Sequence, residues 1–426
     1  MSEFAARLPE VIFGSLVVLA TYFLGKELFG KQIGFASCLF IAFSYIQIAW
    51  SRQARGYVIL DFFFLLILRF LYRFTKYIKI KDFILFILFL ALSIFTHPLG
   101  FVLFPISFIF LAQEKNQSLF FLSKMRKLIF FLFLPIFFLL VFPKGESMVL
   151  YFLDLFRQLL RGENFVSYYH SLFWRQYPIF VFLSFVGFLV LIFNKKKKEF
   201  FFLLISLFCY VFMVCFLGEV PFEKYVFPVF PLVFIISSFS LKQISSVLFK
   251  SRKNILFFVL VGFILVNGNK FSLKPKAFYS LNFDMREIPE IDYKGIYQVV
   301  KEKTTNINKQ DLAIIEIDAD APAWYLGEGI NGFIPRKDSL SAIDVGRGYN
   351  RFVSLDEFKK IQKEHRYGFV NLIEHNFRFY PEGLVEYVRS NLKLEKKQQY
   401  APFSPDWNYW PVELYSWGFS GSDLNK

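Results

Sequence analysis

The amino-acid sequence predicts a helical, polytopic membrane protein that ends in a small α/β domain outside the cytoplasm. Hydrophobic residues make up 55% of the 426 residues, against about 45–50% in soluble domains. The apolar excess lies in residues 8–268, and the remainder reads as a soluble sequence. Basic residues gather in alternate loops between the apolar segments. We therefore expect a transmembrane domain over 1–268 and an extracytoplasmic domain over 269–426.

Long apolar segments predict about ten transmembrane helices, because about 20 residues cross the hydrocarbon core as a helix. The expected spans are, in order, 8–25, 32–49, 57–74, 83–96, 100–113, 128–143, 176–193, 200–217, 226–241 and 254–268. Segment 8–24 lacks the basic start and the cleavage site of a signal peptide.

Loop charge orients the spans. Lys and Arg residues are concentrated in the loops 25–31, 69–82, 114–127, 194–199 and 242–253. The opposite loops carry far fewer. Because basic loops stay in the cytoplasm, the sequence predicts a multi-pass protein of the cell (inner) membrane, with its C-terminal domain on the outer side.

The outer loop 144–175 contains an amphipathic segment. Asp154, Arg157, Gln158 and Arg161 recur at helical spacing opposite an apolar face. An interfacial helix is favoured over a simple connector.

The C-terminal domain alternates helical and strand patterns. We expect helices over 292–302 and 381–392, strands over 312–317, 368–373 and 412–417, and a helix opened by a capping box of Ser354 and Glu357. Such alternation is typical of a small α/β layer.

Composition excludes several classes of function. The net charge of +15 resides in short loops between spans, where the bilayer explains it and no nucleic-acid partner is needed. Cys38, Cys209 and Cys215 all lie in apolar spans, so no disulfide framework is expected. We find no P-loop and no CxxC motif.

The loop SRQARGY between the second and third spans is the first candidate site. Arg52, Arg55 and Tyr57 there suit a phosphate or diphosphate group, since guanidinium pairs phosphate oxygens bidentately. The alternative is that they anchor helix ends. Asp61 lies one turn inside the span, where it belongs to the site, snorkels to the interface or pairs with Arg55.

Two further outer loops carry candidate residues. His97 lies in the tight turn THPLG, where a structural role bonded to the backbone competes with substrate contact. Glu219, Glu223, Lys224 and Tyr225 lie in the loop GEVPFEKYVFPVFP, either around a site or as solvated loop residues.

These motifs, in this order, resemble the membrane glycosyltransferases of the GT-C type. The nearest likeness is to the bacterial relatives of dolichyl-phosphate-mannose protein mannosyltransferases and of lipid A aminoarabinose transferase. It rests on Arg7-Leu8-Pro9, the turn from Leu24 to Gly30, SRQARGY, THPLG, and Lys224-Tyr225 followed by Pro231, with Lys in place of the family's usual Arg. The segments 292–295 and 311–314 resemble the start of the family's external domain.

The resemblance implies transfer of a sugar, with inversion, from a polyprenyl-phosphate donor to a lipid, glycan or protein acceptor. A carboxylate would deprotonate the acceptor. Arg52, Arg55 and Lys224 would stabilise the leaving phosphate. The family's first span and first loop have no counterpart here, so the catalytic acid is unassigned. No metal ligand is assigned, and a divalent metal is left open.

Other classes of protein compete with this interpretation. A transporter or flippase for lipid-linked glycans would favour repeated broken helices, and none is evident. A polymerase or ligase of similar membrane appearance, and a non-catalytic subunit, also remain alternatives.

Overall fold

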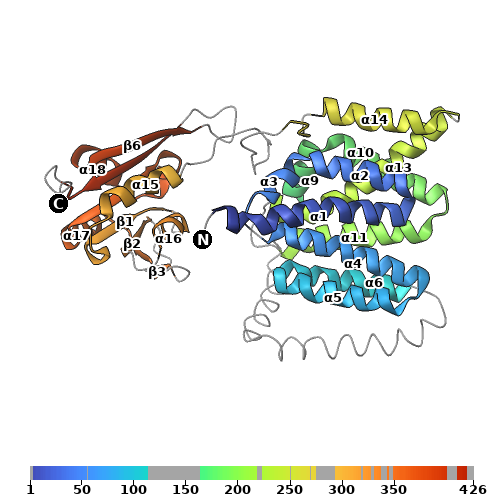
Figure 1. Ribbon diagram of the computed structural model, residues 1–426, viewed down its shortest axis with the longest axis horizontal. Coiled ribbons are helices and arrows are strands. Elements are labelled where there is room, and N and C mark those ends of the chain that lie inside the picture. Colours follow the sequence, from blue (N-terminus) through green and yellow to red (C-terminus); the bar gives the residue numbers. More distant parts are fainter. Residues whose placement is uncertain are drawn as a thin grey trace. The chain divides into compact units, whose positions relative to one another are not determined.

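The computed structural model forms two compact units, Met1–Glu287 and Ile288–Lys426 (Figure 1). The residues described are 3–54, 56–113, 164–217, 223–249, 251–268, 270–274, 293–317, 320–327, 331–336, 343–344, 349–400 and 410–419. The expected span 128–143 lies outside these residues, as do the four polar residues of the expected interfacial helix.

The first unit is helical. Its helices are α1 (Glu3–Phe29), α2 (Lys31–Phe43), α3 (Tyr45–Ser51), α4 (Tyr57–Tyr77), α5 (Ile80–Thr96), α6 (Leu103–Gln113), α9 (Val166–Gln176), α10 (Pro178–Phe193), α11 (Lys197–Leu217), α12 (Glu223–Val226), α13 (Phe230–Leu248) and α14 (Lys253–Asn267). The 3-10 helices η1 (Pro98–Val102) and η2 (Phe227–Val229) lead into α6 and α13.

Three helices in the described part of the chain are long and apolar enough to cross a membrane. They are Phe4–Phe29, Lys197–Phe216 and Lys224–Leu248. The pair Val166–Arg175 and Pro178–Phe193, bent by 103°, would add a fourth if it is one span. The number of about ten spans therefore stays a prediction.

The expected span 32–49 is broken at Ser44, which corrects the sequence-based boundary. Ser44 has an extended backbone, with φ −66° and ψ 129°. Backbone bonds join this break to the segment after α14: Tyr45 N donates to Lys270 O at 3.0 Å, and Ser272 N donates to Phe43 O at 2.7 Å. A partner more than 200 residues away along the chain leaves no local signal in the sequence.

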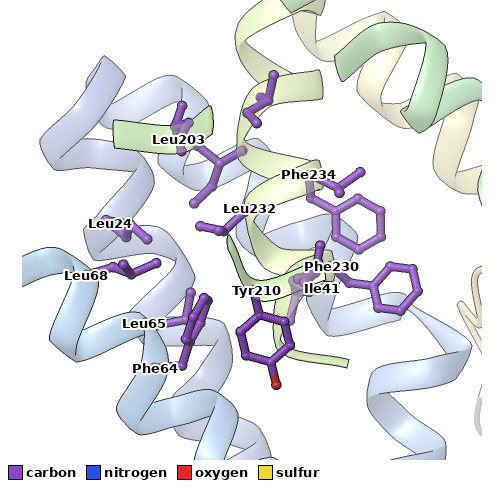
Figure 2. Close-up of a cluster of buried hydrophobic side chains, with 14 of the residues drawn as sticks. Leu24, Ile41, Phe64, Leu65, Leu68, Leu203, Tyr210, Phe230, Leu232 and Phe234 are labelled. Atoms are coloured by element: carbon purple, nitrogen blue, oxygen red, sulfur yellow. The ribbon is translucent and has the colours of Figure 1, made fainter. Parts of the chain in front are cut away.

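Helix α13 is at the centre of the bundle. It packs against α2, α10 and α14, while α1 packs against α2 and α4. Figure 2 shows side chains from α1, α2, α4, α11 and α13 meeting in one apolar core. Close helix approach depends on Gly34, because an added Cβ would lie 2.5 Å from Tyr22 O of α1.

Buried hydroxyls within the helices are mostly satisfied by their own backbone. Thr21, Ser37, Ser107 and Ser206 each donate to the carbonyl four residues earlier, at 2.7–2.8 Å. Such local bonds let short polar side chains lie in an apolar bundle at little cost.

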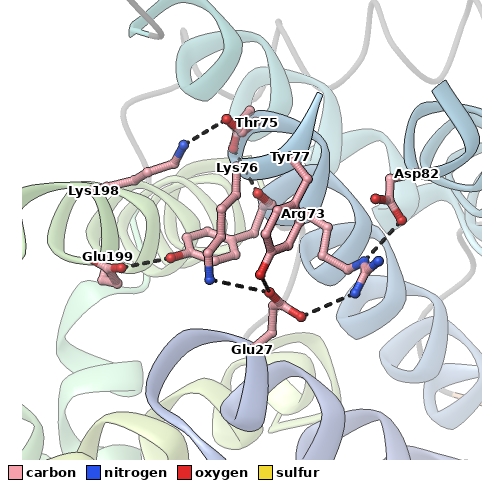
Figure 3. A network of polar contacts seen from close by, with 9 residues as sticks. Glu27, Arg73, Thr75, Lys76, Tyr77, Asp82, Lys198 and Glu199 are labelled. Carbon is pink, nitrogen blue, oxygen red and sulfur yellow. Dashed lines mark hydrogen bonds and ion pairs between the residues drawn. The ribbon is translucent and has the colours of Figure 1, made fainter. Parts of the chain in front are cut away.

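A polar network joins the ends of α1, α4, α5 and α11 (Figure 3). Glu27 of α1 accepts from Arg73, Lys76 and Tyr77 of α4 at 3.3, 3.5 and 3.0 Å. Arg73 also donates to Asp82 of α5 at 3.0 Å. Tyr72 donates to Glu199 of α11 at 2.7 Å, and Lys198 to Thr75 O at 2.9 Å. These contacts fix the helix ends to one another.

The second unit is an α/β domain. Its sheet has the order β3-β4-β2-β1-β5-β7-β6. The strands are β1 (Leu312–Ile315), β2 (Asn331–Pro335), β3 (Ile343–Asp344), β4 (Tyr349–Phe352), β5 (Tyr367–Ile373), β6 (Lys393–Tyr400) and β7 (Trp410–Trp417). Strands β4, β2, β1 and β5 are parallel, and β3, β6 and β7 pair antiparallel.

Helices cover both faces of this sheet. Helices α15 (Tyr293–Thr304) and α16 (Asp320–Leu326) share a core with Leu312 and Ile314. Helices α17 (Leu355–Glu364) and α18 (Leu384–Asn391) share the other core with Ala313 and Ile315. The result is a three-layer arrangement.

Each expected element of this domain is found near its expected position. The capping box forms, with Glu357 N donating to Ser354 Oγ at 3.2 Å. The Glu357 carboxylate accepts the return bond from Val353 N at 2.8 Å, one residue before the cap. Strand β6 has no counterpart among the expected elements, because KLEKKQQY lacks apolar alternation and its pairing with β7 decides its conformation.

Candidate active site

Three of the candidate regions lie at helix ends of the first unit. Tyr57 is the first residue of α4 and is buried. Arg52 follows α3 and is half-buried. Arg55 lies outside the described residues.

The turn around His97 is tightly folded. His97 ends α5 in an extended conformation, and Gly100 N donates to His97 O at 2.9 Å. An added Cβ on Gly100 would lie 2.7 Å from Ser93 C, so a larger residue does not fit. Leu99 N donates to His97 Nδ1 at 3.1 Å. An acceptor Nδ1 requires that the neutral ring carry its proton on Nε2.

Lys224 and Tyr225 lie in the short helix α12. Pro228 and Pro231 follow, and because proline lacks an amide hydrogen the chain passes through η2 before α13 begins. Glu219 lies outside the described residues, and only the backbone of Glu223 is described.

The structure brings Tyr57, His97, Lys224 and Tyr225 together from three distant parts of the sequence. The Tyr57 ring lies 4.8 Å from the His97 ring and 6.1 Å from the Tyr225 ring, between centroids. Lys224 Nζ lies 5.5 Å from the Tyr57 ring centroid and 5.1 Å from that of Tyr225. We call these four residues the outer cluster, after the side of the membrane that the loop charges predict for them.

The outer cluster combines the ammonium group of Lys224 with a buried imidazole. Burial and the positive charge of Lys224 lower the pKa of His97 to about 4. The imidazole is therefore neutral near pH 7, with Nε2 as its donor. One cation held over two aromatic rings, beside one neutral N–H donor, is an arrangement that suits an anion.

Asp61 lies one helical turn inside α4 from Tyr57 and is fully buried. Three further residues near this end were not among the sequence-based candidates. Trp50 of α3 packs 5.7 Å from Tyr57, between ring centroids. Tyr169 of α9 and Tyr210 of α11 are buried and interact electrostatically, and Tyr210 also does so with Tyr57 and Asp61. For Tyr210, the available signal was a phenol hydroxyl in an apolar span.

The described residues contain no group of three or more His, Cys, Asp or Glu side chains that would hold a metal ion. Cys38, Cys209 and Cys215 are free thiols.

Two comparisons with known proteins bear on this arrangement. The family model of dolichyl-phosphate-mannose-protein mannosyltransferases matches residues 1–142. Together with the fold, this match confirms the resemblance to GT-C-type membrane glycosyltransferases that the sequence predicts.

A solved structure of this fold is the crystal structure of ArnT from Cupriavidus metallidurans in the apo state. The similarity has a TM-score of 0.55 at 9% identity, over 96% of this chain and 83% of that chain. No curated protein matches the chain. The shared fold confirms a helical membrane protein with a small C-terminal sheet domain.

Proposed function

We propose that this glycosyltransferase takes its sugar from a polyprenyl-phosphate donor, and that the outer cluster binds the donor phosphate. The observation that carries the proposal is the convergence of Lys224 with Tyr57, His97 and Tyr225. A lipid-linked donor also agrees with the description of the matching family model.

The chemistry follows from the donors in the outer cluster. Lys224 supplies a positive charge, and His97 supplies an Nε2–H whose direction is fixed by the bond from Leu99 N to Nδ1. Fixed donors aimed at a phosphate stabilise the negative charge that develops as the sugar–phosphate bond breaks. The acceptor, a lipid, a glycan or a protein, loses its proton to a carboxylate that we leave unassigned.

We also propose that transfer occurs on the outer face of the cytoplasmic membrane. Tyr57 begins α4, whereas Arg73 and Lys76 of the polar network lie near its other end. Their separation is about 24–29 Å at 1.5 Å per residue, which is close to the thickness of the hydrocarbon core. The Lys-rich ends are the side that the positive-inside rule assigns to the cytoplasm.

The test is binding of undecaprenyl phosphate to the full chain in nanodiscs. Lys224→Met should weaken binding about tenfold or more, because a hydrogen bond to a charged group contributes about 1.5–3 kcal/mol. The matched control is Lys26→Met, which removes an exposed lysine from the last turn of α1 and should bind as the wild type does. Wild-type affinity in Lys224→Met would refute the phosphate site.

A further inference from the structure

Asp61 is an unusual residue in this bundle. Its side chain is 0% exposed, and both carboxylate oxygens are buried with no hydrogen-bond partner among the described residues. In the part of the chain that the structure describes, no other carboxylate has both oxygens in this condition. An unpartnered buried carboxylate is costly, and such a group calls for an explanation.

Tyr210 of α11 shares this condition. Its side chain is 1% exposed, and its hydroxyl is buried with no described partner. Figure 2 shows the hydroxyl pointing away from the leucines Leu203 and Leu232 of the apolar core. The ring packs edge-on against Phe64 of α4, at 5.2 Å between centroids.

Tyr210 packs on the face of α4 that carries Asp61. Tyr57, Asp61 and Phe64 follow one another at intervals of four and three residues, so they lie along one face of α4. Tyr210 contacts this face at Phe64 and interacts electrostatically with Asp61 and Tyr57. The two unpartnered groups thus belong to one polar region.

Several buried hydroxyls of the bundle bond to their own helix backbone, whereas Asp61 and Tyr210 do not. Ser206, one turn before Tyr210 on α11, donates to Phe202 O at 2.7 Å and needs nothing further. Neither the Asp61 carboxylate nor the Tyr210 hydroxyl has such a local bond among the described residues. Two unpartnered groups from different helices, with Asp61 one helical turn from Tyr57, indicate a ligand that supplies hydrogen-bond donors.

We propose that Asp61 and Tyr210 bind hydroxyl groups of the donor sugar, one turn deeper than the phosphate. This inference rests on the proposed function. Asp61 follows Tyr57 by about 6 Å along the helix axis, so a sugar joined to a phosphate at the outer cluster reaches this depth. A carboxylate accepts hydrogen bonds from sugar hydroxyls, and a phenol both accepts and donates. Both residues are therefore sugar-specificity residues.

The experiment compares two ligands on the full chain in nanodiscs. One ligand is undecaprenyl phosphate, and the other is a panel of undecaprenyl-phosphate-linked pentoses and hexoses. The wild type should bind at least one sugar-linked lipid more tightly than the bare lipid phosphate. Asp61→Asn and Tyr210→Phe should each lose that added affinity, about tenfold, while binding the bare lipid phosphate unchanged.

Matched variants separate the possible outcomes. Ser206→Ala, which removes a satisfied hydroxyl from the same helix, should bind both ligands as the wild type does. Lys224→Met should weaken both ligands together. If the wild type binds neither lipid, the proposed function fails.

Three results overturn the sugar site while leaving the phosphate site standing. The first is a wild type that binds no sugar-linked lipid more tightly than the bare lipid. The second is wild-type discrimination in both Asp61→Asn and Tyr210→Phe. The third is an equal loss of both ligands in these variants with a lowered thermal midpoint, because that would mean a packing role.

Discussion

Glu27 allows a quantitative test of the polar network in Figure 3. Glu27→Gln keeps the side chain's shape and removes its charge. The carboxylate is 14% exposed and pairs with Arg73, which is 26% exposed, and with Lys76, which is 38% exposed. The Lys76 pair is worth a few tenths of a kcal/mol, and the Arg73 pair about 1 kcal/mol at most. The Tyr77 bond to a charged acceptor adds about 1 kcal/mol. We expect a loss of about 1–2 kcal/mol, since the amide oxygen retains one bond.

The assay is reversible unfolding of the full chain in mixed detergent micelles. A double-mutant cycle of Glu27→Gln with Arg73→Met should give a coupling energy of about 0.5–1 kcal/mol, because the two side chains are in direct contact. The control is Lys26→Gln, in the same helical turn, which should change the free energy of unfolding by less than about 0.5 kcal/mol. If Glu27→Gln is as mild as this control, or if the coupling is zero, the network does not stabilise the helix ends.

Three other predictions follow from the folded arrangement of the chain. Burial and Lys224 lower the pKa of His97 from 6.5 to about 4, so the free energy of unfolding should fall as the pH drops from 6.5 towards 4, because only the unfolded chain gains the proton in that range. An NMR titration of His97, assigned with His97→Asn, should show that its pKa rises in Lys224→Met. A wild-type pKa near 6.5 would contradict this prediction. Gly34→Ala should lower the thermal midpoint, because the added Cβ would lie 2.5 Å from Tyr22 O. The control is Gly262→Ala, whose added Cβ meets nothing within 4 Å. Equal thermal midpoints for the two variants would disprove the close packing of α1 on α2. Cysteine introduced at the exposed Lys360 should react with an impermeant reagent on spheroplasts, and labelling only after lysis would reverse the proposed orientation.

Most of the outer cluster is identifiable in the amino-acid sequence alone. Tyr57, His97, Lys224 and Tyr225 each lie at an end of an apolar segment, where a charged or aromatic residue stands out against the hydrophobic background. Loop charge assigns those ends to a single side of the membrane. That the Tyr57 ring lies 4.8–6.1 Å from the other three residues is a result of the packing of α4, α5 and α12.

The neighbours of Asp61 in the fold cannot be predicted from the sequence. Pairing with Arg55 is one interpretation of Asp61, and Arg55 lies outside the described residues. Tyr210 lies about 150 residues further along the chain, in a span whose other residues give no reason to single it out. Its contact with Phe64 exists only because α11 packs beside α4.

The sequence by itself determined the membrane class, the helical segments and the α/β character of the C-terminal unit, because hydropathy and periodicity are local properties of the chain. Only the tertiary structure decided the break at Ser44, the position of β6 and the Asp61–Tyr210 region. Each of these depends on a partner far along the chain: Lys270 for the break, β7 for β6 and α11 for Asp61. A hydrogen bond or contact between distant segments has no periodic signature in either segment, so its energy takes effect only once the chain has folded.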